Sequence, residues 1–281
     1  MKTMKMLRLT ALYIFLIALA IFMIYPLIWM FASSFKSNSE IFTSMGLWPK
    51  ESTGFTAYKE GWAGSGRVTY TTFFLNTFVI VLPTVLFTMV SSTLTGYAFA
   101  RFYFKGKKAL FGLVIATVLL PNEVLIVPRY IMFNKFGWLN TYLPFHIPAL
   151  LGTYSFFVFM VVQYIRNIPR DLDEAAYIDG CGTFGIFMRI IMPLSKPALF
   201  SIAIFQVVWR WNDFFNPLLF ITSVRKYPVA LALRMAIEIG EGTNWNRNMA
   251  MSILCMLPPV IVFIIAQKYF VEGITSGSVK G

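Results

Sequence analysis

The sequence PRDLDEAAYIDGCGTFGIFMRIIMPLSKP, residues 169–197, is a polar and charged stretch between long apolar runs. Asp171 is positioned to cap a helix, and Glu174 three residues later completes the spacing of a capping box. Gly180 can take the left-handed conformation that ends a helix. Thr183 can then cap a second short helix. The stretch therefore predicts two short helices joined at a glycine.

The second of these helices is expected to stop at Pro193, because proline cannot continue a helix in its interior. Ala175 and Ala176 leave a patch without large side chains on the first helix, where the surface of a partner can approach closely. We call residues 169–193 the knob. Its pattern favours a protrusion that another protein grips.

The knob resembles the EAA loop, which marks the membrane subunits of binding-protein-dependent ABC importers. Met192 stands where that loop usually has leucine, and Cys181 replaces a commoner alanine. The resemblance implies that the knob docks into a cleft on a cytoplasmic ATPase subunit and transmits nucleotide-driven motion. The residues expected to act in this coupling are Glu174, Ala175, Ala176, Asp179, Gly180, Phe184, Phe187, Ile190 and Pro193.

The composition excludes an ordinary soluble domain. Hydrophobic residues make up 58% of the 281 residues and charged residues only 13%, whereas soluble domains have roughly 25% charged residues. The formal net charge of +12 comes from Lys and Arg residues scattered at the ends of apolar runs. That distribution indicates orientation in a membrane, with lipid as a partner, rather than binding to nucleic acid.

Runs long enough to span a bilayer, about 20 apolar residues each, occur near 9–33, 73–98, 109–128, 144–165, 198–221 and 248–269. We therefore expect an all-α membrane protein with about six transmembrane helices, located in the cell membrane. The first run continues well beyond the apolar core of about 7–15 residues found in a signal peptide. We interpret it as an uncleaved anchor.

Positive charge predicts the orientation, because Lys and Arg near span ends favour the cytoplasm. A dense basic cluster at 101–108 places that connection, the knob and both termini inside. The 34–72 segment is then a partly ordered loop outside the cell. The expected division is a first helix and outer loop at 1–68, a permease domain at 69–270 that contains the cytoplasmic loop 166–197, and a cytoplasmic tail at 271–281.

One group of polar residues lies inside a predicted span, where charge is costly and usually faces protein or water. Arg210 is expected about 20 Å from the cytoplasmic end of its helix, and Asp213 is spaced to pair with it. The pair either joins helices or lines a cavity, and the tryptophans either stack on sugar rings or pack at the boundary. Candidate pathway residues are Glu123, Trp209, Arg210, Trp211, Asn212 and Asp213.

Prolines and small residues also carry predictions for the spans. Pro258 and Pro259 are candidate hinges in the last span, and Pro83 is expected to interrupt the second. A small-residue face suits close packing between helices. It consists of Ser91, Ser92, Thr93, Thr95 and Gly96.

The resemblance extends over essentially the whole chain. The sequences at 211–218, 244–246, 258–259 and 270–281 resemble those of the smaller permease subunit in maltose-type and multiple-sugar ABC importers. This implies a type I ABC importer (MetI-like) fold that forms half of the pathway for a carbohydrate, and the expected carbohydrate is an oligosaccharide. Implied partners are a second homologous permease subunit, two copies of an ABC ATPase subunit that bind ATP and Mg, and an extracytoplasmic solute-binding protein.

Enzymatic alternatives have little support in the sequence. No phosphate-binding GxxxxGK[ST] motif is present, and the GxGxxG at 180–185 follows a predicted helix instead of a strand. One histidine and two distant cysteines suggest neither a metal site nor a disulfide. Two rivals remain: a secondary transporter that binds an ion at Glu123 or Asp213, and a membrane glycosyltransferase that uses Asp171 and Asp173.

Overall fold

The computed structural model describes residues 2–44, 46–64, 68–238 and 244–275, and every regular element in those ranges is helical. The chain divides into two compact units. Unit 1 is Met1–Thr71 with Leu233–Leu257, and unit 2 is Thr72–Ala232 with Pro258–Gly281. The expectation of an all-helical protein is confirmed.

Four stretches are long and apolar enough to cross a membrane: Met4–Ser33, Tyr70–Arg101, Leu143–Arg166 and Trp245–Gln267. They correspond to α1 (Lys2–Ser33), α4 (Tyr70–Arg101), α7 (Leu143–Leu150) with α8 (Ser155–Arg166), and α15 (Trp245–Thr275). Two sharply bent helix pairs raise the number of spans to six if each pair crosses once.

The predicted span at 109–128 is wrong as a single helix. Helix α5 (Lys107–Leu119) stops before Pro121, and a 3-10 turn (Asn122–Leu125) leads into α6 (Ile126–Lys135) at an angle of 103°. Leu120 is extended, with ψ 126°. The residue before a proline avoids the helical region for steric reasons, and this explains the break.

The predicted span at 198–221 is also shorter than expected. Helix α12 (Lys196–Trp211) ends before a polar break, after which α13 (Phe215–Phe220) is a separate short helix. A 3-10 turn (Val224–Lys226) and α14 (Val229–Glu238) follow. The sequence is apolar on both sides of Asn212 and Asp213, but the backbone at these two residues is not helical.

Pro83 does not interrupt its helix, because α4 continues without a break from Tyr70 to Arg101. A proline at this position leaves the carbonyl of Val79 without its usual helical donor. Nε2 of His146 lies 3.1 Å from that carbonyl oxygen and can donate to it. The single histidine of the chain thus satisfies a backbone group that proline has exposed.

Within unit 1, the predicted outer loop is partly ordered, as expected. It contains α2 (Asn38–Thr43) and α3 (Thr56–Ala63). The amide of Asn38 donates to the side chain of Asn244 at 2.8 Å. Glu60 forms an ion pair with Arg247 near the start of α15. These contacts attach the loop to residues far along the chain.

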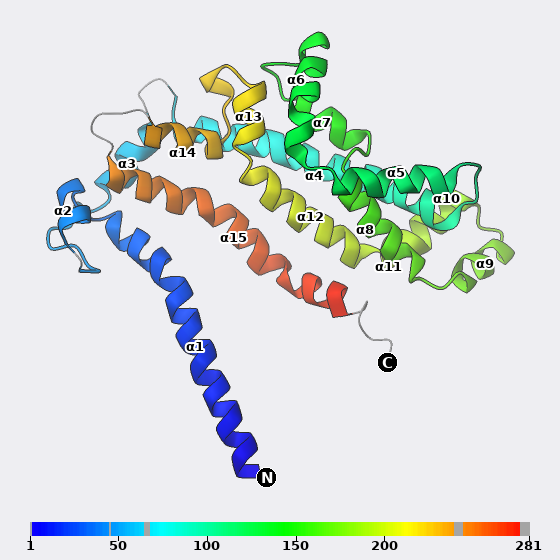
Figure 1. The fold of residues 1–281 in the computed structure, drawn as a ribbon, viewed down its shortest axis with the longest axis horizontal. Helices are drawn as coiled ribbons and strands as arrows, with labels where there is room; N and C mark the ends of the chain where they lie inside the picture. The colour runs from blue at the N-terminus through cyan, green and yellow to red at the C-terminus, as the bar shows by residue number, and fades with distance from the viewer. Residues whose placement is uncertain (1, 45, 65–67, 239–243, 276–281) are drawn as a thin grey trace. The chain divides into compact units, whose positions relative to one another are not determined.

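The core of unit 2 joins α4, α8 and α12 to the knob (Figure 1). The small-residue face of α4 packs closely, as predicted: Oγ of Ser91 donates to the carbonyl of Ala149 at 2.6 Å. A Cβ at Gly96 would lie 2.5 Å from Cγ1 of Val161 on α8. Glycine therefore sets the distance between these two helices.

Gly96→Ala is expected to destabilise the protein by about 1–3 kcal/mol through overpacking. Gly112→Ala in α5 is the matched control, because a Cβ at that glycine meets no atom within 4 Å. There, alanine should be neutral or stabilise the helix by up to about 1 kcal/mol. Thermal unfolding in detergent measures both, and equal melting temperatures for the two variants would refute the packing argument.

Candidate functional site

The knob begins with α9 (Asp171–Ile178), which ends at a left-handed glycine. Gly180 has a φ of +81°. Its N–H donates to the carbonyl of Tyr177 at 3.0 Å, and the N–H of Cys181 donates to the carbonyl of Ala176 at 2.9 Å. This pair of bonds is a Schellman motif. The predicted glycine turn is confirmed.

The predicted caps of the knob are wrong in detail. Helix α9 is preceded by Arg170 as N-cap, whose carbonyl accepts from the N–H groups of Asp173 and Glu174. Asp171 is therefore already inside the helix and forms no cap. Helix α10 (Thr183–Ile186) likewise follows Gly182 and has no side-chain cap.

Pro193 does not stop the second helix. Helix α10 passes into a π-helical turn (Phe187–Ile191) and then into α11 (Met192–Leu194), where the proline occupies the first turn. The helix therefore continues through Pro193 although proline supplies no backbone N–H to the helical hydrogen bonds. The chain bends by 69° only where α12 begins.

The knob is attached to the end of α4 by charge and by aromatic contacts. Nε of Arg101 lies 2.6 Å from Oδ2 of Asp173, and both side chains are largely buried. Arg101 also donates to the carbonyl of Ile168 at 2.9 Å. The rings of Tyr97 and Phe187 are 5.0 Å apart. Asp173, one of the two carboxylates in the DxD-like sequence at 171–173, is thus already paired with an arginine.

The buried face of the knob belongs to the core of unit 2. Ala176 and Phe187 are buried in the same cluster as residues of α4, α8 and α12, and Ile190 packs against it. The expectation that Ala176 and Phe187 present surface to a partner is therefore wrong. The other predicted coupling residues are accessible: Glu174, Ala175, Asp179, Gly180, Phe184 and Pro193 are exposed.

The exposed face of the knob carries large apolar side chains, of which Phe184 was predicted from the sequence and Leu172, Tyr177 and Ile178 were not. Ile178 is 84% exposed, Tyr177 74% and Phe184 72%. Leu172 is also exposed. Because Ala176 faces the core, the periodicity of the helix places Tyr177 and Ile178, the next two residues, on other faces of α9. The result is a rigidly mounted patch of apolar side chains.

The polar group at the end of α12 is held together by one ion pair. Nη1 of Arg210 lies 2.9 Å from Oδ2 of Asp213, and the side chains are 15% and 11% exposed. The carboxylate also accepts from the backbone and side-chain N–H groups of Asn216. Arg210 lies over the ring of Tyr154, 4.9 Å from its centre. The predicted pair is confirmed.

The two tryptophans beside this pair have different environments. Trp211 is 3% exposed and packs against Phe78, with 5.3 Å between ring centres. Trp209 is 47% exposed and contacts Phe156 and Phe157. Only Trp209 therefore keeps a substantial accessible surface for a ligand. Asn212 is exposed and donates to the carbonyl of Val208 at 2.9 Å.

Glu123 is exposed on the turn before α6, and its side chain bonds to no residue that the structure describes.

Gln206 is a buried polar residue that the sequence did not indicate. Its side chain is fully buried and donates to Oγ1 of Thr88 at 3.0 Å. Pro258 and Pro259 lie within the unbroken helix α15.

Removal of the carboxylate in Asp213→Ala is expected to cost about 3 kcal/mol, because it leaves the largely buried Arg210 without a counter-charge. Glu123→Ala should change stability by less than about 0.5 kcal/mol, as surface substitutions usually do. Thermal unfolding compares the two. Equal shifts would show that the ion pair contributes nothing to the fold.

Comparisons with known proteins agree with this geometry. The family described as "Binding-protein-dependent transport system inner membrane component" matches residues 62–276. The probable ABC transporter permease protein YurM of Bacillus subtilis (strain 168) is 33% identical over 97% of this chain and 89% of its own length. The galactooligosaccharides transport system permease protein GanQ of the same organism is 31% identical, with coverage of 100% and 99%.

A solved structure shares the fold. It is a chain of a bacterial ABC transporter involved in the import of the acidic polysaccharide alginate, with a TM-score of 0.82 and 20% sequence identity. The match covers 93% of this chain and 95% of that chain.

Proposed function

Because the chain belongs to the binding-protein-dependent transport system inner membrane components, it is a multi-pass permease subunit, and we propose that its knob couples oligosaccharide import to a separate ATPase. Members of this family carry no ATPase site. ATP and Mg are therefore bound by partner subunits. The chain supplies half of the transmembrane pathway, and a second homologous permease supplies the other half.

The observation that carries the coupling proposal is the two-sided character of the knob. One side is buried in a core shared with α4, α8 and α12. The other side exposes Tyr177, Ile178 and Phe184. A partner that grips the exposed side would move three spans together, since packed interfaces transmit displacement as rigid bodies. Glu174 orients the docked partner through its charge.

The same arrangement supports the orientation that we propose. The end of α4, the start of α5 and the end of α8 lie beside the knob in unit 2 (Figure 1). Basic residues concentrate there, which favours the cytoplasm. Both termini are then cytoplasmic, and the ATPase pair binds on that side. The permease domain at 69–270 contains this loop.

The substrate proposal rests on the relatives and on one exposed side chain. The name of GanQ specifies galactooligosaccharides, and an oligosaccharide is the substrate class we propose for this chain. The family description names a binding protein, and we propose that this protein delivers the substrate from the extracytoplasmic side. Trp209 offers a face for a sugar ring, while Arg210 and Asp213 supply hydrogen bonds. Pro258 and Pro259 act as hinges in α15.

Gly180→Val tests the coupling role directly. A β-branched residue with positive φ costs about 1–3 kcal/mol in backbone strain. Uptake driven by ATP in the assembled transporter should therefore fall at least about tenfold. Gly182→Ala is the control, because that glycine has a φ of −73° and open space around its Cβ position. Full uptake by the Gly180→Val transporter would refute the proposal.

The ion-driven alternative makes a separate prediction. It requires uptake that persists without ATP and collapses when the membrane gradient is removed. Asp213 is already bonded to Arg210 and Asn216, which leaves that carboxylate less free to bind a cation.

A further inference from the structure

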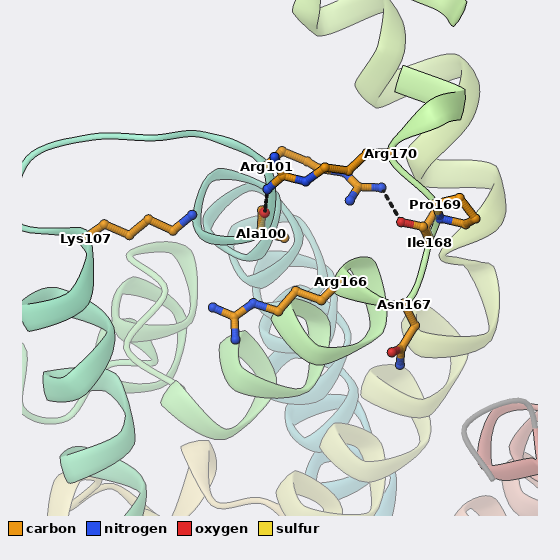
Figure 2. A pocket seen from close by; sticks show the side chains of 8 residues that line it. All are labelled: Ala100, Arg101, Lys107, Arg166, Asn167, Ile168, Pro169 and Arg170. Carbon is orange, nitrogen blue, oxygen red and sulfur yellow. Dashed lines mark hydrogen bonds between the residues drawn. The ribbon is translucent and has the colours of Figure 1, made fainter. Parts of the chain in front are cut away.

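A cavity of about 560 Å³ lies where the chain enters the knob, entirely within unit 2 (Figure 2). Its volume falls within the roughly 300–1,000 Å³ of ligand pockets. Three elements form it: the end of α4, the start of α5 and the connection from α8 to α9. The lining residues are Ala100, Arg101, Lys107, Arg166, Asn167, Ile168, Pro169 and Arg170.

The lining contains four cationic side chains and no acidic one. Arg101 is neutralised by Asp173, which lies outside the lining. Arg170 donates to the carbonyl of Ala100 at 3.4 Å, and Lys107 donates to the carbonyl of Phe102 at 2.7 Å. Neither contact supplies negative charge.

Arg166 leaves the most hydrogen-bonding capacity unused. Its guanidinium lies over the ring of Phe111, 4.8 Å from the centre. It makes no hydrogen bond or ion pair with any residue in the described part of the chain. An arginine carries five N–H donors. Figure 2 shows Lys107 and Arg166 extending toward the cavity from different helices. The cavity therefore presents free donors and a net positive charge.

The position of the cavity indicates the source of an anion. Helices α4, α5 and α8 are all parts of candidate spans, and their ends line the same cavity, so we place the cavity at the membrane–water boundary. None of the residues of α5 is buried, and Leu110 and Leu113 on it are exposed. An apolar surface thus begins one turn from the basic cavity. A molecule with an anionic head and apolar tails matches both features.

We propose that this cavity binds the phosphate of an anionic phospholipid, with Lys107, Arg166 and Arg170 contacting the headgroup and α5 contacting an acyl chain. Charge-assisted hydrogen bonds to phosphate are short and strong, and arginine can bind phosphate in a bidentate manner. The bound lipid would also neutralise the cations next to the Arg101–Asp173 pair. This inference requires membrane insertion only and does not depend on the coupling role of the knob.

The amount of phospholipid bound to the transporter tests the proposed site. The complete transporter is delipidated in detergent and titrated with phosphatidylglycerol or phosphatidylcholine, and bound lipid is counted by native mass spectrometry. Lys107→Gln and Arg166→Gln should each weaken binding of phosphatidylglycerol about tenfold, the effect of losing one hydrogen bond to a charged group. Lys105→Gln is the control, because this exposed lysine lies in the same connection but does not line the cavity.

Three results would overturn the proposal. The first is equal retention of phosphatidylglycerol by the Lys107, Arg166 and Lys105 variants. The second is displacement of the lipid by millimolar inorganic phosphate, which would identify the occupant as a soluble anion. The third is binding of phosphatidylglycerol only after the ATPase subunits have been removed. That result would mean that the ATPase covers these cations in the complete transporter, so that they belong to the subunit interface.

Discussion

Ile178→Asp combined with Phe184→Asp is expected to abolish association with the ATPase subunit while the permease still folds. The two side chains are 84% and 72% exposed in this chain, so their replacement removes little internal packing beyond the contact of Phe184 with the ring of Phe187. Burial of a large apolar side chain against a partner contributes roughly 1.5–3 kcal/mol. Each substitution should thus weaken the complex about 10- to 100-fold, as measured by co-purification of the ATPase from detergent.

Trp48→Ser provides the control for that experiment. Trp48 is 69% exposed, comparable with Phe184, but lies outside the knob. Its replacement should leave the amount of co-purified ATPase unchanged. If the double knob variant retained the ATPase as well as the Trp48 variant does, the exposed apolar patch would have no role in docking.

Asp173→Asn is expected to separate ATP hydrolysis from transport. The substitution leaves Arg101, whose side chain is 6% exposed, without a counter-charge. Breaking a buried pair in this way costs about 3–5 kcal/mol. We expect a lower melting temperature and a knob that no longer moves α4 when the ATPase closes. The ratio of sugar molecules imported to ATP hydrolysed in proteoliposomes should fall at least about tenfold.

Two further variants separate the ion pair from a general charge effect. Asp171→Asn removes an exposed carboxylate two residues earlier that bonds to no residue the structure describes. It should leave the import-to-hydrolysis ratio unchanged. Asp173→Glu keeps the charge and should restore part of the ratio. An Asp173→Asn transporter with normal stability and a normal ratio would eliminate this pair as the mechanical link.

The helical fold and the glycine turn were predictable because they depend on local properties. Apolar run length predicted the membrane helices, and Gly180 predicted the left-handed turn that the structure contains. The Arg210–Asp213 pair was also predictable, since its members are three residues apart. Helix ends were less predictable. An apolar run does not reveal that Pro121 breaks a helix while the backbone continues through Pro83.

The two faces of the knob could not be assigned from sequence. Whether Ala176 or Ile178 faces a partner depends on how α9 packs against α4 and α8, which are distant in sequence. The link between Arg101 and Asp173 spans more than 70 residues, so no local spacing indicates it. The role of His146 depends on a carbonyl freed by proline in another helix.

Cysteine cross-linking tests most directly whether the knob is the contact with the ATPase. Ile178→Cys is introduced with Cys181→Ser, which removes the neighbouring thiol; Cys255 is buried and can stay. A short reagent that carries a maleimide for the new thiol and a photoreactive group for any residue nearby is applied to the assembled transporter, and the adducts are identified by mass spectrometry. We predict a covalent cross-link between position 178 and the ATPase subunit. An intact transporter in which position 178 reacts only with small reagents, and never with the ATPase, would contradict the coupling proposal.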